Sequence, residues 1–127
     1  MILRCELSEN LEQKIENAAL GEIIYALPYD VDAKGLFSKN YFIVTSENII
    51  SVSEEDIVNV FPVKRVEKVK ATELVGAGRL DITVDGVCHV MAKYTAEYMP
   101  QFAMVERIVQ EIIDGETKVH ESFDESK

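Results

Sequence analysis

A stripe of apolar residues at helical spacing marks the last third of the chain. Its members recur at alternating steps of four and three, which places them on one face of a helix: Tyr98, Phe102, Val105, Val109 and Ile112. Pro100 fits the first turn of such a helix, where its missing N–H costs little, and Gly115 suits the end. The pattern predicts a helix over residues 97–114 whose apolar face closes the core, followed by an acidic tail or linker over 116–127.

Short apolar segments separated by turn signals fill residues 22–94, and each has the length of a strand rather than a helix. In "RLDITV" the alternation predicts that one set of side chains points inward, Leu80, Ile82 and Val84, and the other set points outward, Arg79, Asp81 and Thr83. Upstream, valines spaced by three predict a bulge or a kinked turn near residues 64–67, where the alternation changes phase. We count about seven such strands.

Glycines mark the turns between these strands. Gly76 and Gly78 of "GAG" are expected to permit positive φ in one turn, and Asp85-Gly86 is the strongest hairpin signal in the sequence. Parallel strands need long crossover connections, so turns this tight predict an antiparallel sheet.

A short helix is expected before the strands, over residues 8–20, because Ser8 can cap its first turn. The predicted fold is therefore α+β and mainly β. It is a bent antiparallel sheet or partly open barrel of about seven strands, closed by the one long C-terminal helix. Residues 1–115 have the length of a single domain.

Composition narrows the range of partners. The chain carries 23 acidic against 13 basic residues, a net charge of −10, and such a field repels nucleic-acid backbones and anionic lipid. Its sequence holds no run of 18 apolar residues, so no membrane-spanning segment is expected in this chain, and the N-terminus lacks the pattern of a secretion signal. We expect a cytoplasmic protein with two reduced cysteines.

Residue chemistry predicts no catalytic, cofactor or metal site. Cys88 and His89 are adjacent on a strand and point to opposite faces, so they do not share a metal. The calcium-loop rhythm that opens at Asp30 fails because Lys34 and Tyr41 occupy ligand positions. No phosphate-binding glycine loop, nucleophile elbow or Walker A lysine is present, so we expect a non-enzymatic chain without a cofactor.

Two groups of residues are candidates for interaction. The first is the one concentrated basic segment, whose members could bind a phosphorylated head group or an acidic partner: Lys64, Arg65, Lys68 and Lys70. The alternative is that these are solvated outward residues of a strand. The second group is Met99 and Met104, which fall outside the helical stripe and could adapt to a protein partner.

Three stretches together resemble a known family: "GEIIYALPYDVDAKGLFSKNYFIVTSENIISV", "FPVKRVEKVKATELVGAGRLDITVDG" and "KYTAEYMPQFAMVERIVQEI". They are similar to the pleckstrin-homology-like (PH-like) N-terminal domain that precedes the membrane part of certain bacterial ABC exporters. Seven antiparallel strands followed by one helix is also the element order of PH-like domains. The resemblance spans roughly residues 21–113, and its motifs are structural rather than catalytic.

The resemblance implies a cytoplasmic interaction or regulatory domain, tethered to the inner face of the membrane through the rest of an ABC transporter. It also raises the alternative of a PH-like domain for an anionic lipid or phosphorylated head group. The loop that usually gathers basic residues in such domains is "DVDAKGLFSK" here, where Lys34 and Lys39 stand against Asp30 and Asp32. This departure argues against lipid binding.

Overall fold

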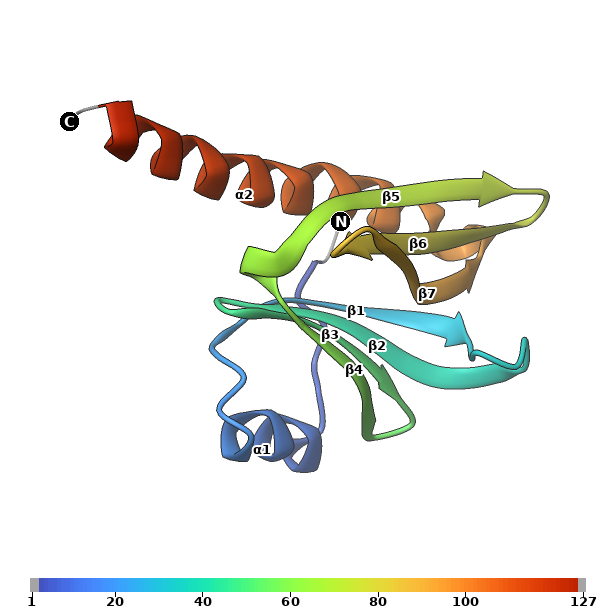
Figure 1. The fold of residues 1–127 in the computed structure, drawn as a ribbon. Coiled ribbons are helices and arrows are strands. Elements are labelled where there is room, and N and C mark those ends of the chain that lie inside the picture. Colours follow the sequence, from blue (N-terminus) through green and yellow to red (C-terminus); the bar gives the residue numbers. More distant parts are fainter. Residues whose placement is uncertain (1–2, 126–127) are drawn as a thin grey trace.

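The computed structural model describes residues 3–125, with side chains to residue 115. Within that range one antiparallel sheet holds seven strands in the order β4-β3-β2-β1-β7-β6-β5 (Figure 1). The elements in chain order are α1 (Glu9–Asn17), β1 (Ile23–Val31), β2 (Phe37–Thr45), β3 (Asn48–Ser53), β4 (Asp56–Pro62), η1 (Val63–Arg65), β5 (Val66–Leu74), β6 (Ala77–Val84), β7 (Val87–Thr95), η2 (Ala96–Tyr98) and α2 (Met99–Glu125). The predicted α+β class, the antiparallel pairing and the two helices are confirmed.

The sheet bends where β1 meets β7. β1 pairs with β2 over most of its length, but it pairs with β7 only at Val31 and Lys93. The N-terminal segment occupies part of the β1 edge instead, because the backbone N–H of Cys5 donates to the carbonyl of Ala26 at 2.9 Å. β1–β4 and β5–β7 therefore form two layers that lie over one another (Figure 1).

α2 closes the space between these layers on one side. Phe102, Val105 and Val109 are buried as predicted and share one core with residues of both layers. Tyr98 and Ile112 are only partly buried, because Tyr98 lies in η2 before the helix and the buried position further along is Ile113.

The predicted end of this helix is wrong. α2 continues through Gly115 to Glu125, into the residues that were expected to be a tail. One glycine inside a helix costs only about 1 kcal/mol, so without a proline or a left-handed turn it does not stop the helix. The side chains beyond residue 115 lie outside the described part of the structure.

A second core lies on the opposite face of β1–β4. Leu11 and Ile15 of α1 are buried there, against residues of β1, β2 and β3. Ser8 caps α1 by accepting the N–H of Leu11 at 3.1 Å, and its hydroxyl donates to Glu55 in the β3–β4 turn at 2.6 Å. Hydrogen bonds from Ser8 and Asn10 lower the pKa of the Glu55 carboxyl. α1 ends earlier than predicted, at Asn17.

Two of the three turn glycines behave as predicted. Gly76 has φ of 71° and Gly86 has φ of 78°, each in a tight hairpin turn. The prediction for Gly78 is wrong, because it lies inside β6 and not in a turn. A Cβ at residue 78 would lie 2.3 Å from Cε2 of Tyr94, so glycine is needed there for the approach of that ring. The predicted irregularity near residues 64–67 is confirmed as η1 and a register shift at the start of β5.

Candidate functional site

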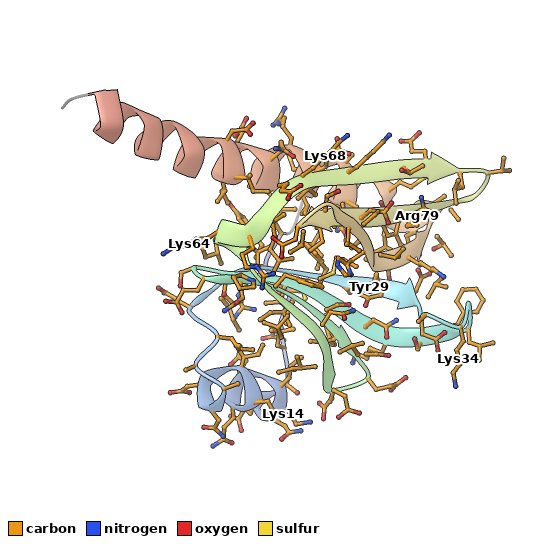
Figure 2. The ribbon with its side chains drawn as sticks, viewed as in Figure 1. Lys14, Tyr29, Lys34, Lys64, Lys68 and Arg79 are labelled. Carbon is orange, nitrogen blue, oxygen red and sulfur yellow. The ribbon has the colours of Figure 1, made fainter. Side chains whose placement is uncertain are left out.

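A cleft of about 520 Å³ opens between the two layers, and no residue of α2 lines it. Its walls come from the β1–β2 turn, from β3 and β4, and from residues 90–93 of β7. We call it the β4–β7 cleft. Figure 2 shows Tyr29 between the layers, and this side chain lines the cleft from β1. The volume falls in the range of small-molecule sites.

Two buried hydroxyl groups form the floor of the cleft. The Tyr29 hydroxyl lies 2.8 Å from Ser51 Oγ, and Ser51 Oγ lies 2.8 Å from the carbonyl oxygen of Met91. Ser51 has one hydroxyl proton and gives it to Met91, so the Tyr29 hydroxyl must donate to Ser51. Burial raises the pKa of the Tyr29 hydroxyl above its ordinary value. The floor is therefore neutral, and its two protons are already used within the protein.

Two further polar side chains line the cleft without a protein partner. Among the residues that the structure describes, neither Ser53 nor Asn59 forms a side-chain hydrogen bond, and both are half-buried. The Asn59 amide has two donors and one acceptor, and the Ser53 hydroxyl has one donor and two lone pairs. These groups are available to a bound molecule.

Apolar side chains stand at the rim on three sides. Leu36 in the β1–β2 turn, Val58 in β4 and Val90 in β7 are 61%, 56% and 43% exposed. Val58 is unpaired in the register between β3 and β4, at a β-bulge that opens this edge. Apolar side chains exposed around a polar floor are a common arrangement in binding sites.

The charged residues of the cleft lie on the side of the β1–β2 turn. Asp32 accepts the backbone N–H groups of Lys34 and Leu36 at 2.9 and 3.0 Å, which closes the turn. The Lys93 ammonium lies 3.5 Å from the Ala33 carbonyl, to which it donates. The Oδ1 atom of Asp32 is therefore occupied in shaping the turn.

The structure does not gather the basic segment into one site. Arg65 pairs with Asp85, whereas Lys68 and Lys70 line a small separate pocket on the outer face of β5 and β6. Figure 2 places Lys64 at η1 and Lys68 on β5. The structure therefore brings Lys68 and Lys70 together but pairs Arg65 elsewhere, and a role of this segment in binding a phosphorylated group or an acidic partner stays a prediction.

Asp81 lies on the outward face with Thr83, as the alternation predicted, but its carboxylate is buried by its neighbours rather than solvated. It lies in the same small pocket as Lys68 and Lys70, whose long side chains stand around it. Arg79 Nε donates to its Oδ2 at 3.0 Å, and Oδ1 has no hydrogen-bond partner among the described residues. Strict alternation predicts the face of the sheet on which a side chain lies, but it does not predict whether neighbouring side chains bury it there.

The two methionines differ from each other. Met99 is not on a free flank as predicted, because it is partly buried and packs against the main core at the start of α2. Met104 is partly exposed, and its sulfur accepts from Arg107 at 3.4 Å. Only Met104 still fits a role as a surface contact.

Neither edge of the sheet offers a regular ladder for another strand. On β5, Gln110 of α2 accepts the N–H of Val69 at 3.0 Å, and Glu106 accepts the N–H of Ala71. At the end of β4, Pro62 has no N–H to offer, and the N–H of Val63 that follows it is donated to the carbonyl of Glu47 at 2.9 Å. The β4 bulge interrupts the ladder further.

Sequence reasoning missed the cleft, since Tyr29, Ser51 and Asn59 lie within three apolar strands and form no linear motif.

Within residues 3–115, no three His, Cys, Asp or Glu side chains converge on a metal position, and no helix in the described chain has the length and apolar content to cross a bilayer. Neither the protein-family models nor the curated proteins include a match to this chain.

Proposed function

We propose that this chain is a non-enzymatic interaction module that binds a partner in the β4–β7 cleft. The observation that carries the proposal is the combination of an exposed apolar rim with unpaired polar groups inside the same cleft. Apolar area that a partner covers supplies affinity, and the polar groups fix its orientation.

The chemistry of the floor favours binding over catalysis. The pKa of a general base must lie near the pH at which the enzyme works, but burial moves the pKa of Tyr29 upward, away from neutrality. The Ser51 hydroxyl donates to a backbone carbonyl and has no histidine or carboxylate beside it in its hydrogen bonds, so nothing activates it as a nucleophile.

The wider setting that we propose is a PH-like domain attached to an ABC-type exporter. The antiparallel sheet in two layers with a helix across one opening supports the PH-like class, and the exporter setting comes from the sequence resemblance alone. In this setting the cleft would hold a segment of a cytoplasmic protein or of the transporter itself.

Site-specific photo-crosslinking in cells of the source organism tests the proposal. A benzophenone amino acid at Val58, on the cleft rim, is expected to give a protein adduct of defined mass. The matched control is the same probe at Val75, which is fully exposed in the β5–β6 turn and does not line the cleft. An adduct that forms equally at both positions, or at neither, would contradict the proposal. A transporter subunit in the Val58 adduct would support the exporter setting.

A further inference from the structure

We infer that the β4–β7 cleft recognises an extended, uncharged apolar peptide segment, through its backbone amide as well as its side chains. This inference rests on the proposed binding function and names the chemistry of the partner. It follows from which hydrogen-bonding groups of the cleft are used and which are left over.

The polar groups left over in the cleft complement an amide. Tyr29 and Ser51 have given their protons within the protein and offer only lone pairs. Asn59 presents a carbonyl oxygen and an NH₂ group side by side, which can pair with the N–H and C=O of a peptide backbone. Ser53 adds a hydroxyl that can donate or accept.

The charges of the cleft argue against an ionised ligand on this floor. Among the described lining residues, charge is carried by Asp32, Lys34 and Lys93, all on the side of the β1–β2 turn. Asp32 is held by two backbone N–H groups and Lys93 donates to Ala33. An ionised group on the floor would exchange its hydration for neutral partners only, which is costly.

An acyl chain is also a poorer occupant than a peptide. Hydrocarbon over the floor would cover Asn59 and Ser53 and leave their donors unpaired, at a cost that a peptide amide avoids. A peptide also places side chains alternately to its two sides. The exposed rim has apolar groups on different sides to receive them, with Leu36 in the β1–β2 turn, Val58 on β4 and Val90 on β7.

Titration of ¹⁵N-labelled protein with a short capped peptide tests this inference. The probe is N-acetyl-Val-Leu-Val-amide, and we expect chemical-shift changes at Ser53, Val58, Asn59 and Val90, including the Asn59 side-chain NH₂. Two comparison probes are the same peptide with its central amide replaced by an ester, and decanoate. Both are expected to bind at least about fivefold more weakly, because the ester lacks the central N–H donor and decanoate lacks every amide N–H and carries an ionised carboxylate.

Asn59→Leu keeps the size of the side chain but removes its amide. This variant should bind the capped peptide about tenfold more weakly and should bind decanoate as well as the wild type does, or better. If this variant fails to fold, Ser53→Ala tests the same discrimination. Val75→Ala, outside the cleft, should change nothing. Tighter binding of decanoate, an unchanged affinity in both cleft variants, or no binding of the peptide would overturn the peptide inference. A positive crosslink at Val58 with no peptide binding would leave the proposed function standing, whereas the loss of both would remove it.

Discussion

Two tyrosines contact the same Phe102 ring from opposite parts of the interior, and their surroundings differ. The Tyr94 ring stacks on Phe102 with centroids 4.2 Å apart, on the side that α2 closes with apolar side chains. The Tyr29 ring meets Phe102 edge-on at 6.4 Å, and its hydroxyl reaches the floor of the open cleft. One side of the core is filled for stability, and the other is polar and accessible. Stability and binding should therefore respond to different substitutions.

The largest effect is expected on the closed side, for Phe102→Asp. This change removes a fully buried ring in contact with three aromatic residues and puts an unpaired charge in its place. Removing a buried Phe alone costs about 3–5 kcal/mol, a large part of the total stability of an ordinary domain, so the variant should not fold. Circular dichroism and thermal unfolding measure this.

The matched control for that change is Phe37→Asp, since Phe37 is 81% exposed. It should keep the Tm of the wild type within a few degrees. If Phe102→Asp also kept that Tm, α2 would not be the element that closes the core.

A smaller loss is expected for Gly78→Ala on the same side. The new Cβ would lie 2.3 Å from the Tyr94 ring, so the ring must move off Phe102, at a cost of about 1–3 kcal/mol in urea unfolding. Gly115→Ala is the control, because a Cβ there meets no atom within 4 Å and alanine favours the helix. Equal stability of Gly78→Ala and the wild type would show that the ring is not confined by the strand.

The contrast between the two sides was only half visible in the sequence. Alternation and tight turns are local, so the antiparallel sheet could be predicted, and so could the burial of Phe102 at helical spacing. Gly78 was misread because its constraint comes from Tyr94, on another strand. The cleft was missed because Tyr29, Ser51 and Met91 meet only after the sheet bends at Val31 and Lys93, and no local pattern encodes that bend.

A smaller loss of stability is expected when the hydrogen bonds between α2 and the edge of β5 are removed. Glu106→Ala leaves the N–H of Ala71 without its carboxylate acceptor, and Gln110→Ala does the same for Val69. Each hydrogen bond contributes about 0.5–3 kcal/mol, and the amide protons of these two residues should exchange faster with solvent. Glu111→Ala, on the exposed side of the helix, is the control. Peptide binding in the cleft should not change in these variants. A changed affinity would show that the closed side and the cleft are energetically coupled, against the contrast drawn between them.

The smallest effect on stability is expected when either tyrosine hydroxyl is removed. Alkaline titration is the sharpest test of the difference between the two tyrosines. Burial raises the pKa of Tyr94 strongly, and the nearby carboxylates of Glu106, Asp81 and Glu73 raise it further, whereas burial alone raises that of Tyr29. A phenol whose pKa is higher in the folded state stabilises the fold below its unfolded pKa of about 10, and this contribution is lost as the pH rises above that value.

Tyr94→Phe should therefore lose less stability than the wild type between about pH 9 and pH 11, and Tyr29→Phe should show the same trend to a smaller extent. At neutral pH the order differs, because Tyr29→Phe removes the hydrogen bond to Ser51 and should cost about 1 kcal/mol. Urea unfolding at both pH values separates the two tyrosines. If the wild type and both variants lost the same stability at alkaline pH, neither hydroxyl would be shielded from water. The assignment of Tyr94 to a closed side of the core would then be wrong.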